Sequence, residues 1–218
     1  MATLITLNVT NMNKMDKDIF IFQEPSLYEG GETPFVNSIY TDKLYNDQTL
    51  TFRIYVQYYG GVQENKSEPK INEPSGERSA IKIVELTPNN NEEVNNSINM
   101  VMDDEENWYL ENAIYDPETQ AGAFRISTPT YGSFDKVFYA GSAVRASSGE
   151  VIMSNFIEAS PNSNMDFQPQ LKFYVQVGSY EAGNVMDFTT SSKMQDFVMH
   201  LREIIHSMLS IQTKVNGK

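Results

Sequence analysis

Cysteine is absent from this sequence of 218 residues, and histidine occurs only twice. Without a thiol the chain has no cysteine nucleophile, no thiolate zinc site and no iron–sulfur cluster. His200 and His206 are six residues apart, which on a helix turns them about 120° away from each other, so they do not share a metal. No Gly-x-Ser-x-Gly motif supplies a serine nucleophile. These absences predict that the protein is not an enzyme.

Positive charge is also scarce, because 16 Lys and Arg stand against 29 Asp and Glu and leave a net charge of −13. A surface this negative repels phosphate backbones, so we expect no nucleic-acid partner. No run of about 20 apolar residues occurs, so we expect no transmembrane helix. The first residues lack a basic stretch before an apolar core, so no signal peptide is expected. The predicted location is the cytoplasm, or the exterior after export by a route without an N-terminal signal peptide.

The hydrophobic pattern has a period of two. Apolar and polar residues alternate over Leu50–Tyr58 and again over Leu171–Val177, as in strands with one buried face. We therefore predict a core that contains Leu50, Phe52, Ile54, Val56, Phe173, Val175 and Val177.

Further short segments rich in Val, Ile, Thr, Phe and Tyr lie between clusters of Gly, Pro, Asn and Ser, the pattern of an antiparallel sandwich. The fold prediction is a mainly β protein, an antiparallel, jelly-roll-like β-sandwich over 1–190. Gly60-Gly61 is expected to form a turn that ends the first long strand. The other predicted strands are Thr3–Val9, Asp18–Gln23, Ala80–Leu86, Gly122–Ser127, Lys136–Val144 and Val151–Ile157.

A weak internal similarity runs through the chain. Asn37–Ile39 precedes Arg53–Gln57, and Ser154–Ile157 precedes Lys172–Gln176 after nearly the same interval. Two interpretations stand at this point: duplication of a half-sandwich, or convergence of short strands on similar residues.

Residues 191–212 change to steps of three and four between apolar positions, which predicts one amphipathic C-terminal α-helix. Such a helix packs on its own sandwich or on a partner, which is another protein or a second copy of the chain. The predicted partner-binding seam consists of Met194, Val198, Leu201, Ile205 and Met208.

Acidic residues concentrate between Glu85 and Glu118, and no Lys or Arg lies between Lys82 and Arg125. Carboxylates are ligands that calcium accepts, although the spacing is not that of an EF-hand. A solvated acidic face is one interpretation, and a site for calcium or for a basic partner is the other; no other cofactor is expected. The candidate ligands are Asp103, Asp104, Glu105 and Glu106.

Aromatic residues form the other candidate site. The alternation places several tyrosines outward or at strand ends, where flat rings suit a sugar or a protein surface. Packing under a loop or under the C-terminal helix is the alternative. The candidate ligand-binding residues are Tyr55, Tyr59, Trp108, Tyr109 and Tyr174.

Together these features predict a non-catalytic β-sandwich that acts through protein–protein contacts, self-association into a homo-oligomer included. The alternative is a carbohydrate- or membrane-surface-binding module of the lectin or toxin kind. The third hypothesis is a hydrolase that uses a pair of carboxylates.

Overall fold

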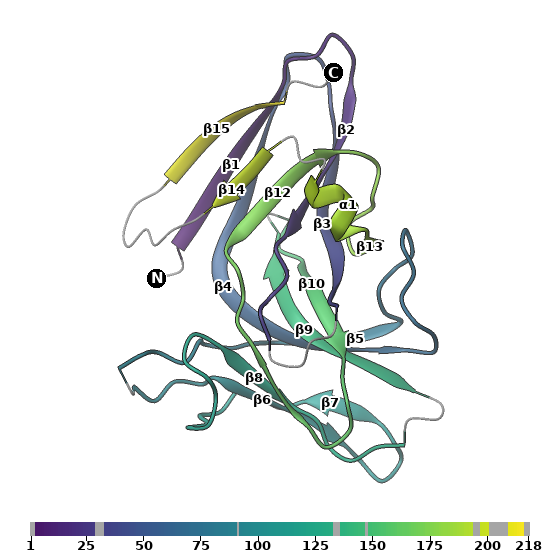
Figure 1. Ribbon diagram of the computed structural model, residues 1–218, viewed down its shortest axis with the longest axis vertical. Helices are drawn as coiled ribbons and strands as arrows, with labels where there is room; N and C mark the ends of the chain where they lie inside the picture. The colour runs from purple at the N-terminus through teal and green to yellow at the C-terminus, as the bar shows by residue number, and fades with distance from the viewer. Residues whose placement is uncertain are drawn as a thin grey trace.

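The computed structural model describes residues 3–28, 33–90, 92–132, 136–146, 148–193, 197–200 and 209–215 (Figure 1). Over these ranges the chain forms one sheet of 11 strands, a second sheet of four strands and one short helix, α1 (Phe188–Lys193). The prediction of a mainly β protein is confirmed.

The large sheet contains strands from the whole length of the chain. They are β1 (Thr3–Asn11), β2 (Lys17–Gln23), β3 (Phe35–Leu44), β4 (Thr49–Asn65), β5 (Arg78–Ile83), β9 (Val137–Arg145), β10 (Val151–Glu158), β12 (Lys172–Val177), β13 (Val185–Met186), β14 (Phe197–His200) and β15 (Leu209–Val215). The small sheet consists of β6 (Ser97–Met102), β7 (Trp108–Leu110), β8 (Phe124–Ser127) and β11 (Asn164–Phe167).

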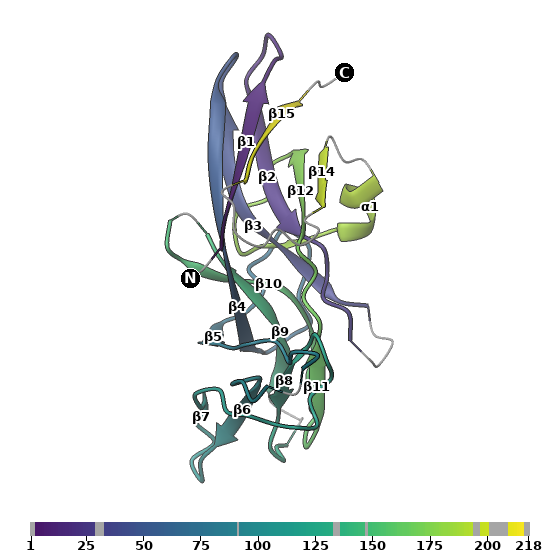
Figure 2. The same cartoon turned by 90° about the vertical axis from the view of Figure 1, so that its left-hand side faces the viewer.

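The order of the large sheet is β14-β12-β2-β3-β10-β9-β4-β1-β15, with β13 beside β3 and β5 beside β4. Among the described strands of this sheet, only β1 and β15 pair in parallel. The 17-residue strand β4 pairs with β1 through its first half and with β9 and β5 through its second half, with a register shift between Tyr55 and Tyr59. The sheet therefore curls, and the small sheet lies at one end of the long axis (Figures 1 and 2).

Curling lets distant strands of one sheet share a core. Phe52 and Ile54 from β4 pack in the same buried cluster as Phe173 and Val175 from β12, and each is at most 2% exposed. Leu50, Val56 and Val177 are half-buried against this cluster. A second core joins β4 and β9 to the small sheet, through residues that include Trp108, Phe124 and Phe138. The predicted buried face of the two alternating strands is confirmed.

Gly60 and Gly61 do not form the predicted turn, because β4 continues to Asn65. A Cβ atom on Gly60 would lie 2.7 Å from Ile98 Cδ1 and 2.8 Å from Phe124 Cε2. A Cβ on Gly61 would overlap the sulfur of Met153 on the other face. Glycine occupies these positions because neighbouring side chains pack directly on the backbone from both faces.

The predicted C-terminal helix over 191–212 is wrong. Helix α1 ends at Lys193, while 197–200 forms β14 and 209–215 forms β15. Val198 lies in β14; Met194, Leu201, Ile205 and Met208 lie outside the described residues. The physical reason is backbone hydrogen bonding. The N–H and C=O groups along the free edges of β12 and β1 need partners, and β14 and β15 supply them. Leu209–Val215 also alternates apolar and polar residues, as a strand does.

The internal similarity falls on symmetrically placed strands. Asn37–Ile39 lies in β3 and Ser154–Ile157 in β10, and these two strands are antiparallel neighbours. The strand order is symmetric about this pair, with β2 and then β12 on one side and β9 and then β4 on the other. The units β2-β3-β4 and β9-β10-β12 therefore occupy equivalent places, and the third strand of each lies beside the first strand of the other. Duplication of a three-stranded unit predicts this arrangement.

One buried and two half-buried tyrosines make the stability of the fold depend on pH in the alkaline range. Burial, and to a smaller extent the negative charge of Glu158, raises the pKa of Tyr131 and of Tyr139 to about 12. Burial and a hydrogen bond to Asp42 raise the pKa of Tyr40 to about 12. A tyrosine in an unfolded chain titrates near pH 10.

We therefore expect stability to be complete below about pH 10 and to fall between about pH 10 and 12, because the unfolded chain releases these protons first. Phenolate absorbance and circular dichroism, followed in one titration, should show some tyrosines ionising only as the sheet unfolds. Intact circular dichroism with all tyrosines ionised would contradict this expectation.

Candidate functional site

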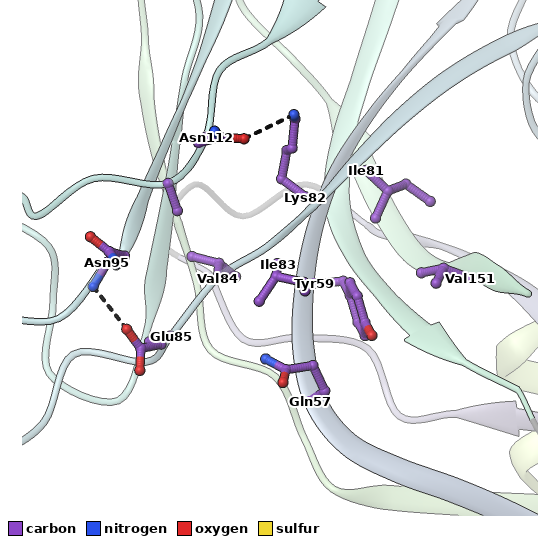
Figure 3. A pocket seen from close by; sticks show the side chains of 11 residues that line it. Gln57, Tyr59, Ile81, Lys82, Ile83, Val84, Glu85, Asn95, Asn112 and Val151 are labelled. Carbon is purple, nitrogen blue, oxygen red and sulfur yellow. Dashed lines mark hydrogen bonds between the residues drawn. The ribbon is translucent and has the colours of Figure 1, made fainter. Parts of the chain in front are cut away.

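A groove of about 640 Å³ follows the edge strand β5 (Figure 3). One side of it is mostly apolar and includes Tyr59, Ile81, Ile83 and Val151. The opposite side is polar and includes Lys82, Glu85, Asn95 and Asn112. Within β5, Ile81 and Ile83 lie on one side and Lys82 on the other, because successive residues of a strand point to opposite faces. The groove therefore has an apolar side and a polar side along β5.

The edge of β5 that faces away from β4 is open. Within the described part of the chain, β4 is the only strand that pairs with β5. Val84 donates its backbone N–H to Tyr58 O at 3.1 Å, directly after the strand. Because antiparallel pairs alternate between bonded and non-bonded positions, the N–H and C=O of Ile81 and Ile83 point away from β4. An open edge of this kind is a template for another strand.

The polar side is held in place by hydrogen bonds. Lys82 Nζ donates to Asn112 Oδ1 at 3.1 Å (Figure 3). The backbone N–H of Asn95 donates to Glu85 Oε2 at 3.1 Å, and the N–H of Glu85 donates to Asn95 O at 2.9 Å. These contacts fix the loop after β5 against the start of the small sheet and keep the groove formed. Sequence reasoning missed this site: Ile81 and Lys82 lay in a predicted strand, but only the topology identifies that strand as an edge.

The acidic run after β6 builds a turn. Asp103 Oδ1 accepts the backbone N–H groups of Glu105 and Asn107 at 2.9 Å each, and Oδ2 accepts Asn107 Nδ2 at 3.1 Å. Hydrogen bonds from Asn107 lower the pKa of Asp103. Lys136 Nζ donates to the carbonyl of Glu106 at 3.0 Å. No three Asp, Glu or His residues converge on a metal-sized site anywhere in the described ranges, and calcium binding by Asp103, Asp104, Glu105 and Glu106 stays a prediction.

The candidate aromatic residues do not share one surface. Trp108 is 1% exposed and Tyr174 3%. The expectation that alternation places Tyr174 outward is therefore wrong, and ligand binding by the aromatic residues stays a prediction. Tyr174 stacks on Phe22 and contacts Phe188 of α1, because the short helix covers this face of β12. Tyr59 is also buried, although its side chain borders the groove, as Figure 3 shows. Tyr55 and Tyr109 are exposed.

Trp108 has a structural role in the small sheet. Its indole Nε1 donates to Glu64 Oε2 at 2.5 Å, and the guanidinium of Arg78 lies 4.7 Å from its ring centroid. Arg78 Nη2 also donates to the carbonyl of Trp108 at 2.8 Å. These contacts connect β5 to β7, beside the groove.

Ser142, within Gly141–Ala143, is a buried packing residue of β9. Its hydroxyl lies 2.6 Å from that of Ser26, and its carbonyl accepts Ser154 Oγ at 3.2 Å. The contacts of Ser142 are those of a structural hydroxyl between strands.

His200 lies in β14, and His206 is outside the described residues.

None of the helical residues described here forms a segment long and apolar enough to cross a bilayer. Comparisons of the chain with protein-family models, with curated proteins and with solved structures give no significant match.

Proposed function

We propose that the chain is a non-catalytic assembly protein that associates with other protein chains, its own copies included, through the C-terminal strands of its large sheet. The observation that carries the proposal is the position of 197–200 and 209–215. These two stretches form β14 and β15, the two outermost strands of the sheet order. Outermost strands are the elements that meet another chain when sheets associate.

β15 has the properties of a pairing edge. Its seven residues pair with β1 in an unbroken parallel register from Ile5 and Leu209 to Asn11 and Val215. Among the described strands it pairs with β1 alone. The strand contains no proline and one charged residue, Lys214. Natural edge strands that avoid association carry bulges, prolines or several charges, and β15 carries none of these protections beyond its single lysine.

Two neighbouring proline substitutions test the proposal. In a parallel strand the N–H groups of consecutive residues point to opposite sides. Of Ile211→Pro and Gln212→Pro, one therefore removes a bond to β1 and the other removes an outward N–H. We expect the wild-type chain to sediment as an oligomer, more strongly as salt screens the net charge of −13 over a Debye length of about 8 Å. The variant that lacks the outward N–H should be a folded monomer.

Ile211→Val and Gln212→Thr are the matched controls, because both keep every backbone N–H, and they should sediment as the wild type does. Circular dichroism separates a folded monomer from an unfolded chain. A wild-type chain that remains monomeric at high concentration and moderate salt would contradict self-association through β15.

A further inference from the structure

We propose that the outward face of β4 and β9 binds the turn between β6 and β7 of a second copy of the chain. In this contact, Asp104 and Glu105 of one copy meet Arg53 and Arg145 of the next. The contact goes beyond the proposed function, because it uses neither β14 nor β15 and does not depend on pairing through them.

Two arginines flank an exposed tyrosine on the outward face. Arg53 and Tyr55 alternate with buried residues of the inner core, so both side chains point outward. Arg145 pairs with Tyr55 across the strands, and its guanidinium lies 6.0 Å from the centroid of the tyrosine ring. Arg145 is therefore a diagonal neighbour of Arg53, at about 7–8 Å between Cα atoms. Two guanidinium groups and one ring that is 39% exposed thus form one surface.

The surroundings of these arginines contain almost no acid. No described carboxylate lies within ion-pair distance of Arg53 or Arg145. Both lie among the neighbouring strands β15, β1, β4 and β9. These four strands also contain Lys214, and their only acid is Glu64 near the far end of β4. In a chain with a net charge of −13, this region is positive, so its charge selects an anionic partner.

The same chain presents a matching pair of carboxylates. Most carboxylates of the acidic segment that follows β5 accept a hydrogen bond or pair with a cation. Among the described residues of this segment the exceptions are Glu93, Asp104 and Glu105, and only the last two are adjacent. Both are exposed. They are therefore the carboxylates best able to meet two guanidinium groups of another copy.

The turn holds this pair in a fixed arrangement. Glu106 donates its backbone N–H to Asp103 O at 3.0 Å, so Asp104 and Glu105 are the two central residues of a tight turn. Asp103 Oδ1 also accepts the N–H groups of Glu105 and Asn107 at 2.9 Å each. Because the loop is already ordered, its binding costs little further conformational entropy.

The two surfaces of one chain lie apart. The small sheet, which carries the turn, is at one end of the long axis, and β1, which pairs with the outward-facing part of β4, lies toward the other (Figures 1 and 2). The contact therefore joins different copies. Because its two sides are different surfaces, it is head-to-tail and repeats into an open series or a ring. Exposed ion pairs are screened by salt, so this contact weakens as salt is added, whereas association through β15 strengthens.

Charge reversal tests the contact by sedimentation velocity in about 10 mM salt, where the Debye length is about 30 Å. Every chain carries the β15 proline substitution that removes the outward N–H, so that β15 pairing does not contribute. Asp104→Lys with Glu105→Lys raises the net charge of −13 by four charges, to −9. Net repulsion alone would then make this chain associate more strongly than its parent. We expect it to associate about tenfold or more weakly, and the same loss for Arg53→Glu with Arg145→Glu.

The chain with all four reversals is the matched control, because it exchanges the sign of both surfaces and keeps the net charge of −13. We expect it to associate within about threefold of the parent. Circular dichroism confirms that each chain is folded, as expected for exposed side chains. A parent that is monomeric in low salt, no loss on reversing Asp104 and Glu105, or no recovery in the fourfold variant would each overturn the proposal. Association through β15 is tested at moderate salt, so the two can fail separately.

Discussion

Replacing Gly141 with alanine is expected to lower the free energy of unfolding by about 3 kcal/mol, at the upper end of the usual cost of overpacking. Gly141 lies in β9 opposite Gly61 of β4 and Phe156 of β10. A Cβ atom there would overlap the carbonyl oxygen of Asn155 and lie 2.6 Å from the Cα of Phe156. Both contacts are with backbone, so no side-chain rotation relieves them and β10 itself must move.

The consequence extends beyond one residue because β10 pairs with both β9 and β3, close to its register shift between Met153 and Asn155. Urea unfolding followed by circular dichroism measures the effect. Gly132→Ala is the matched control, since a Cβ at Gly132 meets no atom within 4 Å, and we expect a change within about 0.5 kcal/mol. If Gly141→Ala behaves like this control, the close approach of β9 and β10 is not as described.

The strands that the sequence predicts best are those in which apolar and polar residues alternate, because the alternation also shows which face is buried. Leu50–Tyr58 carries five apolar residues at alternate positions, and Leu171–Val177 carries four. The buried face of each strand follows from that pattern. Alternation does not predict β7 and β11, of three and four residues, because segments this short hold at most two periods. Their burial results from packing on β4 and β9, which no local pattern records.

The errors at Gly60-Gly61 and at the C-terminus have one physical origin. Glycine serves a turn and a close strand contact equally well, and only the position of Ile98 and Phe124 decides between them. Apolar residues at 197 and 198 likewise fit a helix or a strand. The unpaired backbone of β12 decides for a strand, and that information lies in a segment more than 20 residues earlier in the chain.

The candidate groove shows the same limit. Alternation identifies Ile81 and Ile83 as one face of a strand, but an edge is a property of the whole sheet order. Asn112 enters the groove through the loop after β7, and its sequence surroundings carry no signal for that role. Alternation and ring chemistry alone do not show which aromatic residues are exposed, because Tyr174 is buried against α1 and Trp108 in the core of the small sheet.

Arg125→Met is expected to destabilise the small sheet by about 3–5 kcal/mol, the usual cost of removing one partner from a buried ion pair. Arg125 is 8% exposed. Its Nε and Nη2 donate to the two carboxylate oxygens of Asp166 at 2.7 and 3.1 Å. Nη1 donates to Asp116 Oδ2 at 3.1 Å, and Nη2 also donates to the carbonyl of Glu118 at 2.8 Å. The guanidinium thus connects β8 to β11 and to the acidic loop that precedes β8.

The cost arises from the charges that remain after the substitution. The Asp166 side chain is only 9% exposed, and without Arg125 its carboxylate keeps only the backbone N–H of Gln120 at 2.9 Å among the hydrogen bonds described here. Arg125→Lys preserves the charge but not the bidentate geometry, so we expect its stability to lie between that of the wild type and that of Arg125→Met. Trp108 is the single tryptophan of the chain and belongs to this sheet, so its fluorescence reports the transition.

The double variant Arg125→Met with Asp166→Leu separates the two sources of the effect. If the loss comes from an unpaired buried carboxylate, removing that carboxylate recovers part of the stability, and the two substitutions are strongly non-additive. Recovery is expected to be incomplete, because the N–H of Gln120 and the carboxylate of Asp116 lose their partner as well. If the double variant is instead less stable than Arg125→Met by the full cost of Asp166→Leu alone, the two residues act independently. The ion pair would then not be what holds β8 against β11.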